Sequence, residues 1–578
     1  MTGFKFIFCR KLFVFFFSLF LISFFAKSAF RQNKSSSFAN QQRVSTPIKT
    51  KISIDKLPLV REPAILTCTI TSAKDAPSTK VQIELPPDTR VIDGNVNWEG
   101  DIFAGDVLEL SLKIAFDTEG NKAIFCRALR VIDADNVWGD LSELYLAIGT
   151  DETFKHFTPA PSPRRELPGE PENPKDKKPS EINQETPVQE MLKNMIPQPP
   201  GTMPSDSSLR AASNESTGYE AGLLTINGRW RFYDRDDTLT SEQMLVEIVR
   251  GDNNDHLAWC YTDIDGLYSC GPFSNPNSAG IKSWFLSYMN FSPYDDILVT
   301  INPDWGTTAS TDNAYVTTTP VEIFSDGTHD IGAWEVPNNS TYERAYWITE
   351  DLIRVYKYIW FETGMSQNPQ ETAGPGTVEW KIDSTDGTYY LEAGNIHLTG
   401  ADPLSNTVVG HEYAHNIMYS VYGYYPTTNC PDLHYIEDRS SIICAWTEGW
   451  ANFLPLAVNN DPIYRWSSGA MLNLETPTWG TAGWDEGDDV EGRVAGALWD
   501  IYDSINDGYD KYCDGSIINI WDVFFHEKHD NFFQYWTSWI SRGHNISGAN
   551  KSIYQNTIQY SIPPTITMPW IPLLLLDD

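Results

Sequence analysis

Basic residues are scarce in this sequence. Among 578 residues, 42 are Lys or Arg and 77 are Asp or Glu, which gives a formal net charge of −35. Because nucleic acids are bound through clustered basic side chains, this charge argues against a nucleic-acid partner. Apolar side chains are not scarce: 41% of the residues are hydrophobic and 13% are aromatic, enough to fill several cores. The length therefore predicts a multidomain protein.

Long apolar runs are also missing, with one exception near the N-terminus. Residues 12–25 are apolar, follow Lys5, Arg10 and Lys11, and are followed by small residues. This order is typical of a secretory signal peptide, predicted here over residues 1–29, and the run is short for a membrane span. An uncleaved membrane anchor is the alternative. The sequence thus predicts a secreted or cell-surface protein with no stable membrane insertion after cleavage.

Cysteine is sparse, and most of the eight residues fall into neighbouring pairs. Cys9 lies in the predicted signal peptide, which leaves seven. In an extracellular protein we expect disulfides, because oxidation is permitted there. The predicted pairs are Cys68 with Cys126, Cys260 with Cys270, and Cys430 with Cys444. Cys513 is left over, and buried reduced thiols are the alternative for the pairs.

Alternating apolar and polar residues predict a β-sandwich over residues 48–150. Residues 64–71 and 107–114 alternate with period two, which places one face of each strand on a core. If Cys68 and Cys126 lie on facing strands, the pattern favours an immunoglobulin-like sandwich. No catalytic cluster is present in this region. A spacer, or a module that contacts a surface or matrix, is the expected role.

Residues 151–215 are predicted to form a disordered linker. Twelve prolines lie among polar residues between Pro159 and Pro204. Such a segment cannot bury enough apolar surface to fold. Strand patterning returns over residues 216–336, which we predict to form a second β-sandwich.

Two acidic turns are candidate calcium sites. Residues 262–268 are similar to the turn of carboxypeptidase-regulatory-like β-sandwiches, and Asp263 and Asp265 in this turn offer the hard oxygen ligands that calcium prefers. An ordinary Asp-Gly turn explains the same pattern. The second turn, residues 503–510, lacks the EF-hand pattern because Ile505 occupies a ligand position. A loop capped by Asp and Asn side chains is the alternative there.

Helical periodicity begins near residue 340. Apolar residues recur at three- and four-residue steps from Ala345 to Ile359, and Gly364 ends the pattern. Short strand-like runs follow at residues 378–382, 388–391 and 395–398. Helices then dominate, and we predict an α+β domain over residues 337–560.

The sharpest chemical signal is His411-Glu412-Tyr-Ala-His415. On a helix, residues four apart share a face, so both imidazoles can bind one zinc ion. Glu412 is placed to take a proton from a water molecule whose pKa the zinc lowers. Apolar residues around the motif and Gly423 after it favour a helix. Two surface histidines on an ordinary helix are the alternative.

A catalytic zinc needs a third protein ligand and an open fourth position. Glu448 is the favoured candidate, because an apolar stripe predicts a helix around it. Asn452 lies one turn later, where it can accept a hydrogen bond from the far nitrogen of a ligand histidine. Glu437 and His434 are rival third ligands that lie nearer to the histidine pair in sequence.

The HExxH motif and the later Glu448 helix resemble the gluzincin metallopeptidases, the thermolysin-like group of the MA clan. The resemblance covers about residues 340–545 and implies a zincin-like metallopeptidase domain. It implies that His411, His415 and Glu448 are zinc ligands. It also implies that Glu412 is the general base.

The sequence departs from this family pattern in places. Asn452 stands where the family usually has Asp, which polarises a histidine more strongly. Met418 and Val421 exclude the metzincin pattern, which needs Gly and His there. Residues 394–399 resemble the edge strand that lies over the zinc in this clan, to which an extended peptide can add. An ordinary strand with a structural His397 is the alternative.

The group that stabilises the oxyanion is not assigned by the resemblance. The family's downstream histidine is missing, because residues 488–500 contain none. Arg493 is the candidate substitute, with a buried Arg–Glu ion pair to Glu491 as the alternative. Other candidate donors are His434, Tyr435 and His526.

These features predict a secreted zinc metalloendopeptidase that acts on a protein or peptide substrate. The preference for internal peptide bonds rests on the family resemblance. The main alternative is a surface adhesion or scaffold protein with a degenerate peptidase domain, which Asn452 and the missing histidine favour. A zinc hydrolase of another bond, such as a glycan deacetylase, is a second alternative.

Overall fold

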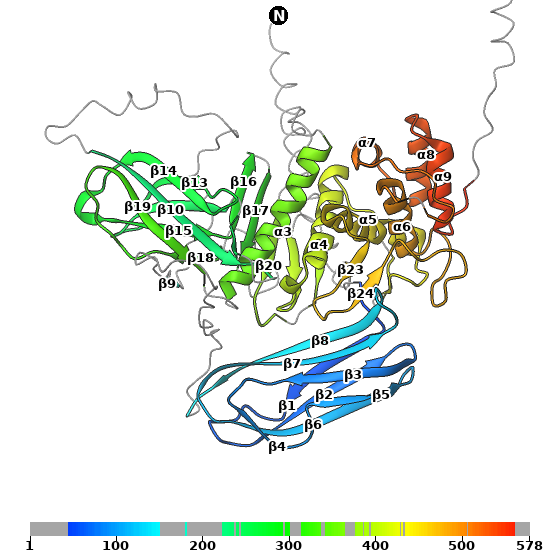
Figure 1. Ribbon diagram of the computed structural model, residues 1–578, viewed down its shortest axis with the longest axis horizontal. Helices are drawn as coiled ribbons and strands as arrows, with labels where there is room; N and C mark the ends of the chain where they lie inside the picture. The colour runs from blue at the N-terminus through cyan, green and yellow to red at the C-terminus, as the bar shows by residue number, and fades with distance from the viewer. Residues whose placement is uncertain are drawn as a thin grey trace, which may run out of the picture. The chain divides into compact units, whose positions relative to one another are not determined.

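The structure is a computed structural model that describes residues 44–150, 180–181, 222–235, 239–241, 244–292, 295–300, 314–336, 341–363, 376–384, 387–391, 395–427, 429–431, 434–505 and 507–560. The predicted signal peptide, and the predicted linker apart from residues 180–181, lie outside these residues. The described chain belongs to one compact unit, Arg43–Asp578. It is multidomain, rich in sheets at first and in helices toward the C-terminus (Figure 1). None of its described helices is both long and apolar enough to span a membrane.

Two antiparallel sheets form the N-terminal β-sandwich. One has the strand order β1-β2-β6-β4, and the other contains β8-β7-β3-β5. Their bounds are β1 Ile48–Ile54, β2 Ala64–Ser72, β3 Ala76–Glu84, β4 Thr89–Asp93, β5 Asn97–Ile102, β6 Val107–Phe116, β7 Gly120–Val131 and β8 Val137–Ile148. The predicted alternation is confirmed in β2, where Leu66, Cys68 and Ile70 are fully buried and alternate with partly exposed residues. The predicted Cys68–Cys126 disulfide joins the two sheets.

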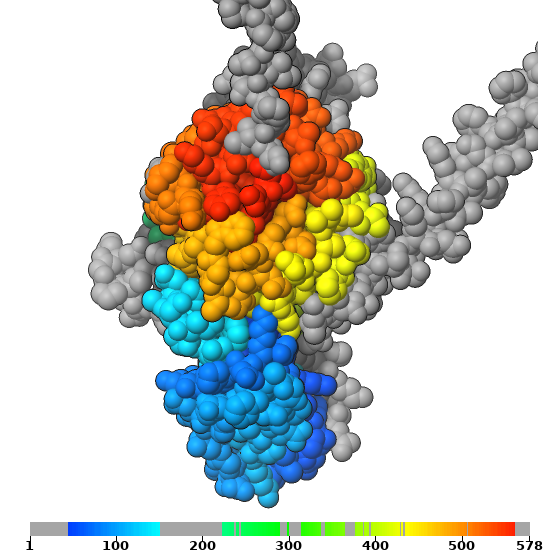
Figure 2. Space-filling model, turned by 90° about the vertical axis from the view of Figure 1, so that its right-hand side faces the viewer, coloured from blue at the N-terminus to red at the C-terminus, as the bar shows by residue number. Residues whose placement is uncertain are grey.

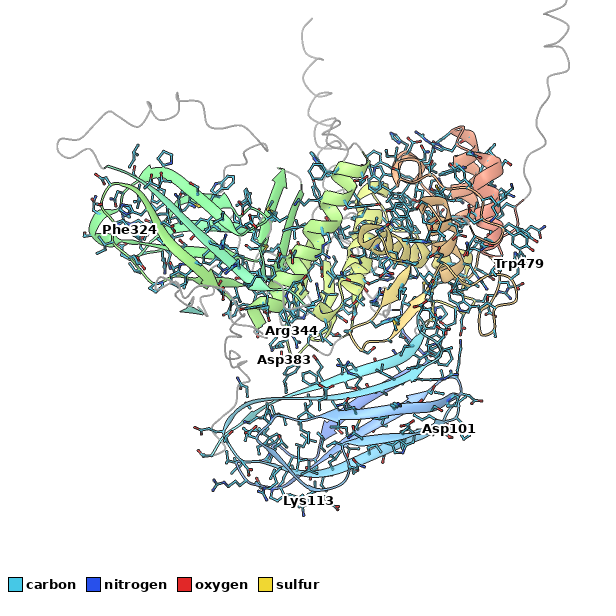
Figure 3. All side chains as sticks on the ribbon, viewed as in Figure 1. Asp101, Lys113, Phe324, Arg344, Asp383 and Trp479 are labelled. Carbon is cyan, nitrogen blue, oxygen red and sulfur yellow. A yellow bond between two sulfur atoms is a disulfide. The ribbon has the colours of Figure 1, made fainter. Side chains whose placement is uncertain are left out.

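The second sheet of this sandwich continues into a later part of the chain. Strands β23, Ile463–Arg465, and β24, Met471–Asn473, extend it through the pairing of Met471 with Val137. Arg344, labelled in Figure 3, forms an ion pair with Glu143 of β8 at 3.7 Å, and both side chains are largely buried. The sandwich is therefore attached to later segments by backbone pairing and by charge.

A second pair of sheets spans β10 to β19. One has the order β11-β10-β14 with β19 parallel to β10, and the other has the order β13-β12-β15-β18-β9. Their bounds are β9 Ser180–Glu181, β10 Leu223–Tyr233, β11 Leu239–Thr240, β12 Leu245–Arg250, β13 His256–Tyr261, β14 Leu267–Ser274, β15 Ile281–Leu286, β18 Val316–Thr318 and β19 Gly327–Glu335. The predicted Cys260–Cys270 disulfide joins β13 to β14. Strand β9, part of the predicted linker, pairs with β18.

A mixed sheet crosses the boundary predicted at residue 337. Its order is β16-β17-β20-β22-β21. The bounds are β16 Tyr288–Ser292, β17 Asp295–Thr300, β20 Gly376–Trp380, β21 Tyr389–Leu391 and β22 Asn395–Leu398. Strand β17 pairs in parallel with β20, and a parallel pair needs a long crossover, which here includes helix α3, Thr341–Glu362. The residues predicted as a second sandwich thus supply two strands to the sheet that follows.

The two sides of that boundary also share a hydrophobic core. The ring of Trp230 on β10 stacks on Phe285 of β15 at 4.7 Å and meets the edge of Tyr346 of α3 at 4.8 Å. Tyr346 donates its hydroxyl to the carbonyl of Phe285 at 2.9 Å. Because all three residues are fully buried, α3 packs on the second sandwich as well as on the helices after it.

Helices dominate the C-terminal part, as predicted. They are α3, α4 Asn406–Tyr422, α5 Ile442–Asn459, α6 Glu491–Tyr502, α7 Ile518–His526, α8 Phe532–Ser541 and α9 Ile546–Gln555. The helix predicted to end at Gly364 is α3, and the three short runs after it form β20, β21 and β22. Helices α3 and α4 lie against the mixed sheet in Figure 1, and Figure 2 shows the surface over α8 and α9.

Candidate metal centre

Helix α4 carries the histidine pair. Ser405 caps its start, because the hydroxyl oxygen accepts a hydrogen bond from the backbone N–H of Val408 at 3.2 Å. Gly423 ends it in the left-handed conformation at φ 69°, which glycine adopts without strain. The helix ends where the sequence predicts. His411 and His415 therefore lie one turn apart on one face, and both are buried.

Helix α5 carries Glu448. Its N-cap is Ser441, whose hydroxyl oxygen accepts from the backbone N–H of Cys444 at 3.1 Å. The predicted apolar stripe is at most 1% exposed and consists of Trp446, Trp450, Phe453, Leu454 and Ala457. This stripe fixes the rotation of α5 in the core, and with it the direction of Glu448.

Two glycines next to the candidate ligands let the helices approach closely. A Cβ atom at Gly410 of α4 would lie 2.9 Å from Cβ of Pro455 on α5. A Cβ atom at Gly449 of α5 would lie 2.7 Å from Cβ of Val494 on α6. Both separations are shorter than carbon atoms tolerate, so any larger residue would push the helices apart. The positions of His411 and Glu448 depend on these two close helix contacts.

The three predicted ligands converge on one point. The Nε2 atoms of His411 and His415 are 3.1 Å apart. The Oε2 atom of Glu448 lies 3.3 Å from the first and 3.4 Å from the second. All three residues are at most 5% exposed. In the described part of the chain they form one of two groups of ligand-type atoms that lie within 4.8 Å of one another.

Two edges of this triangle, 3.3 and 3.4 Å, have the dimensions of a tetrahedral zinc site, and the third, 3.1 Å, is slightly shorter. Zinc binds imidazole nitrogen and carboxylate oxygen at about 2.0–2.2 Å, so neighbouring ligand atoms lie roughly 3.3–3.6 Å apart. Two imidazoles and one carboxylate form a ligand set of catalytic zinc sites, in which a fourth position stays open. The residues present therefore fit zinc in both chemistry and spacing.

Tyr425 orients one of the two histidines. Its hydroxyl lies 2.8 Å from Nδ1 of His415. Burial, together with the charges of Glu448 and Glu412, raises the pKa of Tyr425 well above its ordinary value, so the hydroxyl stays protonated. When Nδ1–H donates to this oxygen, the Nε2 lone pair faces the triangle. Tyr425 could not be predicted from the sequence, because it lies beyond the end of α4 and only the fold returns it to the site.

Glu448 carries a negative charge within the core. Burial alone raises the pKa of its carboxyl group, but the charge of His415 and the contacts with both imidazoles outweigh that effect. The pKa of Glu448 therefore lies well below its ordinary value. The ionised form is the one that binds a divalent metal.

Glu437, a rival third ligand, lies outside the triangle. Its Oε1 is 3.1 Å from Nζ of Lys74, on the turn between β2 and β3 of the N-terminal sandwich. Burial raises the pKa of Glu437 to about 7. Lys74 also lies 2.5 Å from the neighbouring Asp438. Glu437 therefore takes part in an ion-pair contact with the sandwich.

The predicted Cys430–Cys444 disulfide lies next to Glu448. The Sγ atom of Cys430 is 3.9 Å from Oε1 of Glu448. The other cysteine of this disulfide, Cys444, belongs with His434 and Glu491 to the second group of closely spaced ligand-type atoms. Nδ1 of His434 is 2.9 Å from Oε2 of Glu491, and both residues are buried. Because Cys444 is oxidised, its sulfur is not a thiolate ligand, and His434 is paired with a carboxylate instead.

Arg493, the predicted oxyanion donor, is fully buried and contacts backbone carbonyls. Its guanidinium donates to the carbonyl oxygens of Asp485 at 3.0 Å, Pro477 at 2.8 Å and Thr478 at 3.2 Å. Within the described residues it forms no ion pair with Glu491, which bonds His434. These contacts give Arg493 a role in holding the loop before α6. A role in catalysis stays a prediction.

The hydrogen bond predicted for Asn452 is not formed. Both polar atoms of its side chain are buried and have no hydrogen-bond partner among the described residues. Nδ1 of His411 is also buried without a hydrogen-bond partner among the described residues. Nδ1 of His415, by contrast, contacts the hydroxyl of Tyr425. The expected support of a ligand histidine therefore comes from a tyrosine hydroxyl at His415 and not from this amide.

The strand predicted to lie at the edge of the sheet is an interior strand. Strand β22, which includes His397, pairs in parallel with β20 and antiparallel with β21. In the strand order β21 stands at the end, paired with β22, so among the described strands β21 is the edge strand. Tyr390 of β21 lies near the triangle, with its ring 6.4 Å from that of His415. His397 bonds the carbonyl oxygen of Gly387 and is buried, as its structural alternative requires.

The first candidate calcium turn is built by backbone hydrogen bonds. Oδ1 of Asp263 accepts from the N–H groups of Asp265 at 2.9 Å and Leu267 at 2.8 Å. This is the arrangement of an ordinary Asp-Gly turn, the alternative that the sequence left open. Within the described residues neither Asp263 nor Asp265 belongs to a group of closely spaced ligand atoms.

The second candidate calcium turn belongs to a larger cluster of carboxylates. Asp500 of α6 is buried, and burial and its acidic neighbours Asp510, Asp503 and Asp507 raise its pKa well above the ordinary value. Burial raises the pKa of Asp503 to about 7, with added repulsion from Glu475. Asp510 and Glu475 shift in the same direction, again mainly through burial. Like charges that are crowded and buried favour protonation.

Comparison with known families supports part of this interpretation. The family model named Mycolysin C-terminal domain matches residues 362–557, about a third of the chain. The match includes α4, α5 and α6, and with them all three residues of the triangle. No curated protein matches the sequence.

Solved structures share only weak similarity with the chain. The CARDB domain of a Pyrococcus furiosus protein is 13% identical and covers 19% of this chain and 100% of its own, with a TM-score of 0.15. A FixG-related protein from Vibrio parahaemolyticus is 13% identical over 18% of this chain and 96% of its own, with a TM-score of 0.15. An Escherichia coli alpha-2-macroglobulin is 9% identical over 36% of this chain and 24% of its own, with a TM-score of 0.16. Similarities at this level carry no conclusion.

The contact between Tyr425 and His415 leads to a first prediction. Tyr425→Phe removes the hydroxyl, and we expect zinc affinity to fall by about 10–100-fold, the usual effect of losing such a partner. The measurement is a competition titration against a chromogenic chelator. Tyr424→Phe is the matched control, because its hydroxyl bonds Asp530 at 3.1 Å instead of a histidine. Equal zinc affinities in both variants would contradict the role assigned to Tyr425.

The acidic cluster leads to a second prediction. A folded-state pKa of about 7 for Asp503 is higher than in the unfolded chain, so its stabilising contribution is present below about pH 4 and is lost as pH rises toward 7. We expect Tm, measured by calorimetry without added calcium, to fall between pH 5 and pH 8. Asp503→Asn should reduce that fall by a few degrees. The exposed Asp106→Asn should not, and an unchanged fall in Asp503→Asn would refute the prediction.

Proposed function

We propose that this chain is a secreted zinc-dependent metalloendopeptidase. The observation that carries the proposal is the buried triangle of His411, His415 and Glu448, with atoms 3.1–3.4 Å apart, and with Glu412 beside it on α4. The matched family domain also supports it, because that domain belongs to thermolysin-like peptidases. Three disulfides agree with an extracellular protein.

The metal would be held by the two imidazoles and one carboxylate. His411 and His415 would donate through Nε2, and Glu448 through Oε2, the atoms that face one another. When bound, zinc would polarise the carbonyl group of the scissile bond and make a neighbouring water molecule more acidic. Tyr425 would keep the ring of His415 in the orientation that this bonding needs.

Glu412 is proposed as the general base. It follows His411 directly on α4 and is only 1% exposed, so its carboxylate is shielded from bulk water. It would accept a proton from the attacking water and later deliver it to the leaving amine nitrogen. A zinc site with a purely structural role has no use for this carboxylate, so Glu412 favours catalysis over the scaffold alternative.

The substrate is proposed to bind as an extended peptide along β21. This strand forms the edge of the mixed sheet, and its residue Tyr390 lies near His415. Backbone groups on a sheet edge can pair with any peptide chain, so binding does not require a free terminus. This mode supports cleavage of internal peptide bonds.

The oxyanion is proposed to be stabilised through His434 rather than Arg493. His434 is buried beside the disulfide that contacts Glu448, and its charge lowers the pKa of Glu448, which requires proximity. The carboxylate of Glu491 would hold the imidazole in position through Nδ1. An imidazole held in this way can donate a hydrogen bond where negative charge develops.

A calcium ion is a further proposal for the loop of residues 503–510. Burial, with added repulsion from neighbouring carboxylates, raises the pKa values of Asp503 and Asp510, and a divalent cation would relieve that repulsion. Added calcium should then restore the Tm lost between pH 5 and pH 8, and Asp503→Asn should weaken this effect.

The role of Glu412 gives the central prediction. Glu412→Gln keeps the shape of the side chain but removes the base, and we expect kcat/KM on casein to fall by about 10²–10⁴-fold. Zinc content should stay near that of the wild type, because Gln replaces no ligand. The full chain is used, with Glu362→Gln at the exposed end of α3 as the control.

The outcomes separate the alternatives. Activity in the wild type alone, stopped by a chelator and restored by zinc, supports the peptidase. Zinc in both proteins without cleavage of any peptide favours the degenerate scaffold, in line with the unpartnered Asn452 amide. Release of acetate from acetylated sugars would favour a deacetylase. Absence of zinc from both would overturn the metal site itself.

The role of His434 gives a separate prediction. We expect His434→Gln to lower kcat by about 10²–10³-fold with little change in KM or zinc content. Glu491→Gln should shift the pH–rate profile, because it changes the environment of the same imidazole. His526→Gln is the matched control, since His526 is exposed and bonds the carbonyl oxygen of Asp522. A normal kcat in His434→Gln would show that its role is structural.

A further inference from the structure

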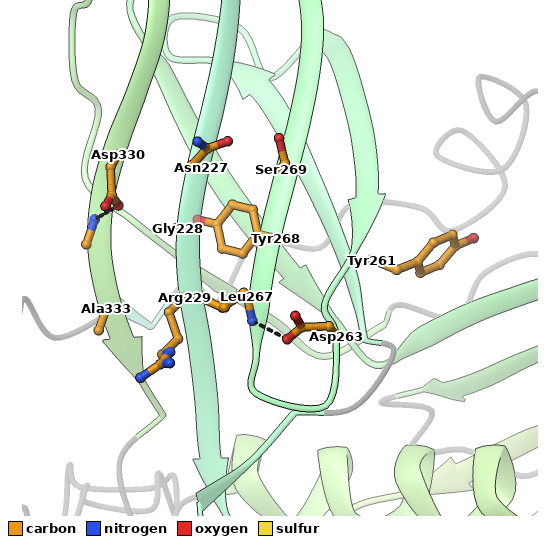
Figure 4. A pocket seen from close by; sticks show the side chains of 11 residues that line it. Asn227, Gly228, Arg229, Tyr261, Asp263, Leu267, Tyr268, Ser269, Asp330 and Ala333 are labelled. Carbon is orange, nitrogen blue, oxygen red and sulfur yellow. Dashed lines mark hydrogen bonds between the residues drawn. The ribbon is translucent and has the colours of Figure 1, made fainter. Parts of the chain in front are cut away.

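A cleft of about 630 Å³ lies on the second β-sandwich, away from the residues of the candidate metal centre. Strands β10, β14 and β19 form its floor (Figure 4). On β10, Leu224, Ile226 and Trp230 face the core, whereas Asn227 and Arg229 alternate with them and face the cleft. The volume falls within the range of about 300–1,000 Å³ typical of small-molecule sites.

The floor of the cleft is a polar surface bordered by small residues. In the strand register, Asn227 lies between Ser269 on β14 and Asp330 on β19. Two residues along β10, Arg229 lies opposite Ala333 of β19. Ser269 and Ala333 are small, and together with Asn227 and Arg229 they line the cleft.

Three residues that line this cleft have a buried polar side-chain atom without a hydrogen-bond partner in the described chain, and one of these atoms is the hydroxyl oxygen of Tyr268. Nε of Arg229 and Oδ1 of Asn227 are inaccessible to solvent and bond no atom of the described residues. The guanidinium of Arg229 also has no ion-pair partner there, although acids outnumber bases 77 to 42 in the chain. Buried polar groups are normally satisfied, so each of these atoms marks a side chain of the cleft that lacks a partner within the described protein.

Two carboxylates flank the arginine. Asp263 and Asp330 lie on opposite sides of Arg229 in Figure 4. Asp263 is fixed by accepting from the N–H of Leu267 at 2.8 Å, and Asp330 by accepting from the N–H of Gly332 at 2.8 Å. Each of these bonds uses Oδ1. The cleft therefore contains one cation, Arg229, and two carboxylates that are held by backbone hydrogen bonds.

We infer that this cleft binds an acidic saccharide, with the carboxylate of a uronic acid on Arg229 and ring hydroxyls on Asp263, Asp330 and Asn227. Hydroxyl groups suit these partners because each can both donate and accept. A guanidinium pairs strongly with a carboxylate. The flanking carboxylates would repel a polyanion, which limits the ligand to an isolated acidic group.

A peptide fits this cleft less well than a sugar. Strand β10 is paired on both sides, with β14 and β19, so the floor offers no free backbone edge for a peptide to pair with. Recognition there depends on side chains alone. This inference does not depend on the proposed peptidase activity.

Calorimetric titration of the full chain with sodium glucuronate and with glucose tests the inference. We expect glucuronate to bind and glucose to bind at least about tenfold more weakly, because it lacks the carboxylate. Arg229→Gln should weaken glucuronate binding by at least about tenfold. Arg250→Gln, an exposed arginine that pairs with Asp252, should not change it.

Other results would overturn the inference. No binding of either sugar to the wild type, or equal binding of both with no effect of Arg229→Gln, would exclude an acidic-sugar site. Tighter binding of a short peptide with a free C-terminal carboxylate would assign the cleft to another class of ligand. Unchanged zinc content and Tm in Arg229→Gln show that the variant is folded, and Asn227→Ala provides a second, uncharged test of the same cleft.

Discussion

The close contact of α4, α5 and α6 is the constraint on which the candidate centre depends. Three ligand-type atoms from two helices meet within 3.1–3.4 Å, and a site of this size tolerates little displacement. Gly410 and Gly449 keep the helix axes close, and both are sequence neighbours of proposed ligands. The apolar stripe of α5 then fixes its rotation. The residues proposed to bind the metal and the glycines that let the helices pack closely are thus direct neighbours in the sequence.

Burial gives the same region its electrostatic character. Glu448 and Glu412 are both almost inaccessible to solvent, which is costly for carboxylates without a nearby positive charge. A divalent cation on the two imidazoles would supply that charge. The Cys430–Cys444 disulfide lies against Glu448 and holds the long segment between α4 and α5 close to it. Pairing of His434 with Glu491 satisfies a further buried charge nearby.

The sequence predicts local features well and contacts between distant segments poorly. Helix α4, with its cap and its glycine end, follows from local pattern, as does the spacing of His411 and His415. All three disulfides follow from pairing near neighbours. Tyr425 and the contacts of Arg493 do not, because they depend on how loops return to the helices. The place of β22 inside its sheet depends on β21, a strand of only three residues, too short for its pairing to be predicted.

The mixed sheet joins two parts of the chain that the sequence pattern assigns to separate domains. Its strands β16 and β17 come before residue 337, and its strands β20, β22 and β21 come after it. A gene fragment that begins at residue 337 would encode the HExxH motif but only part of the sheet beside it, and would leave Tyr346 without the aromatic rings on which it packs. Transfer of this centre to another protein, by recombination or by design, would therefore have to carry the preceding strands with it.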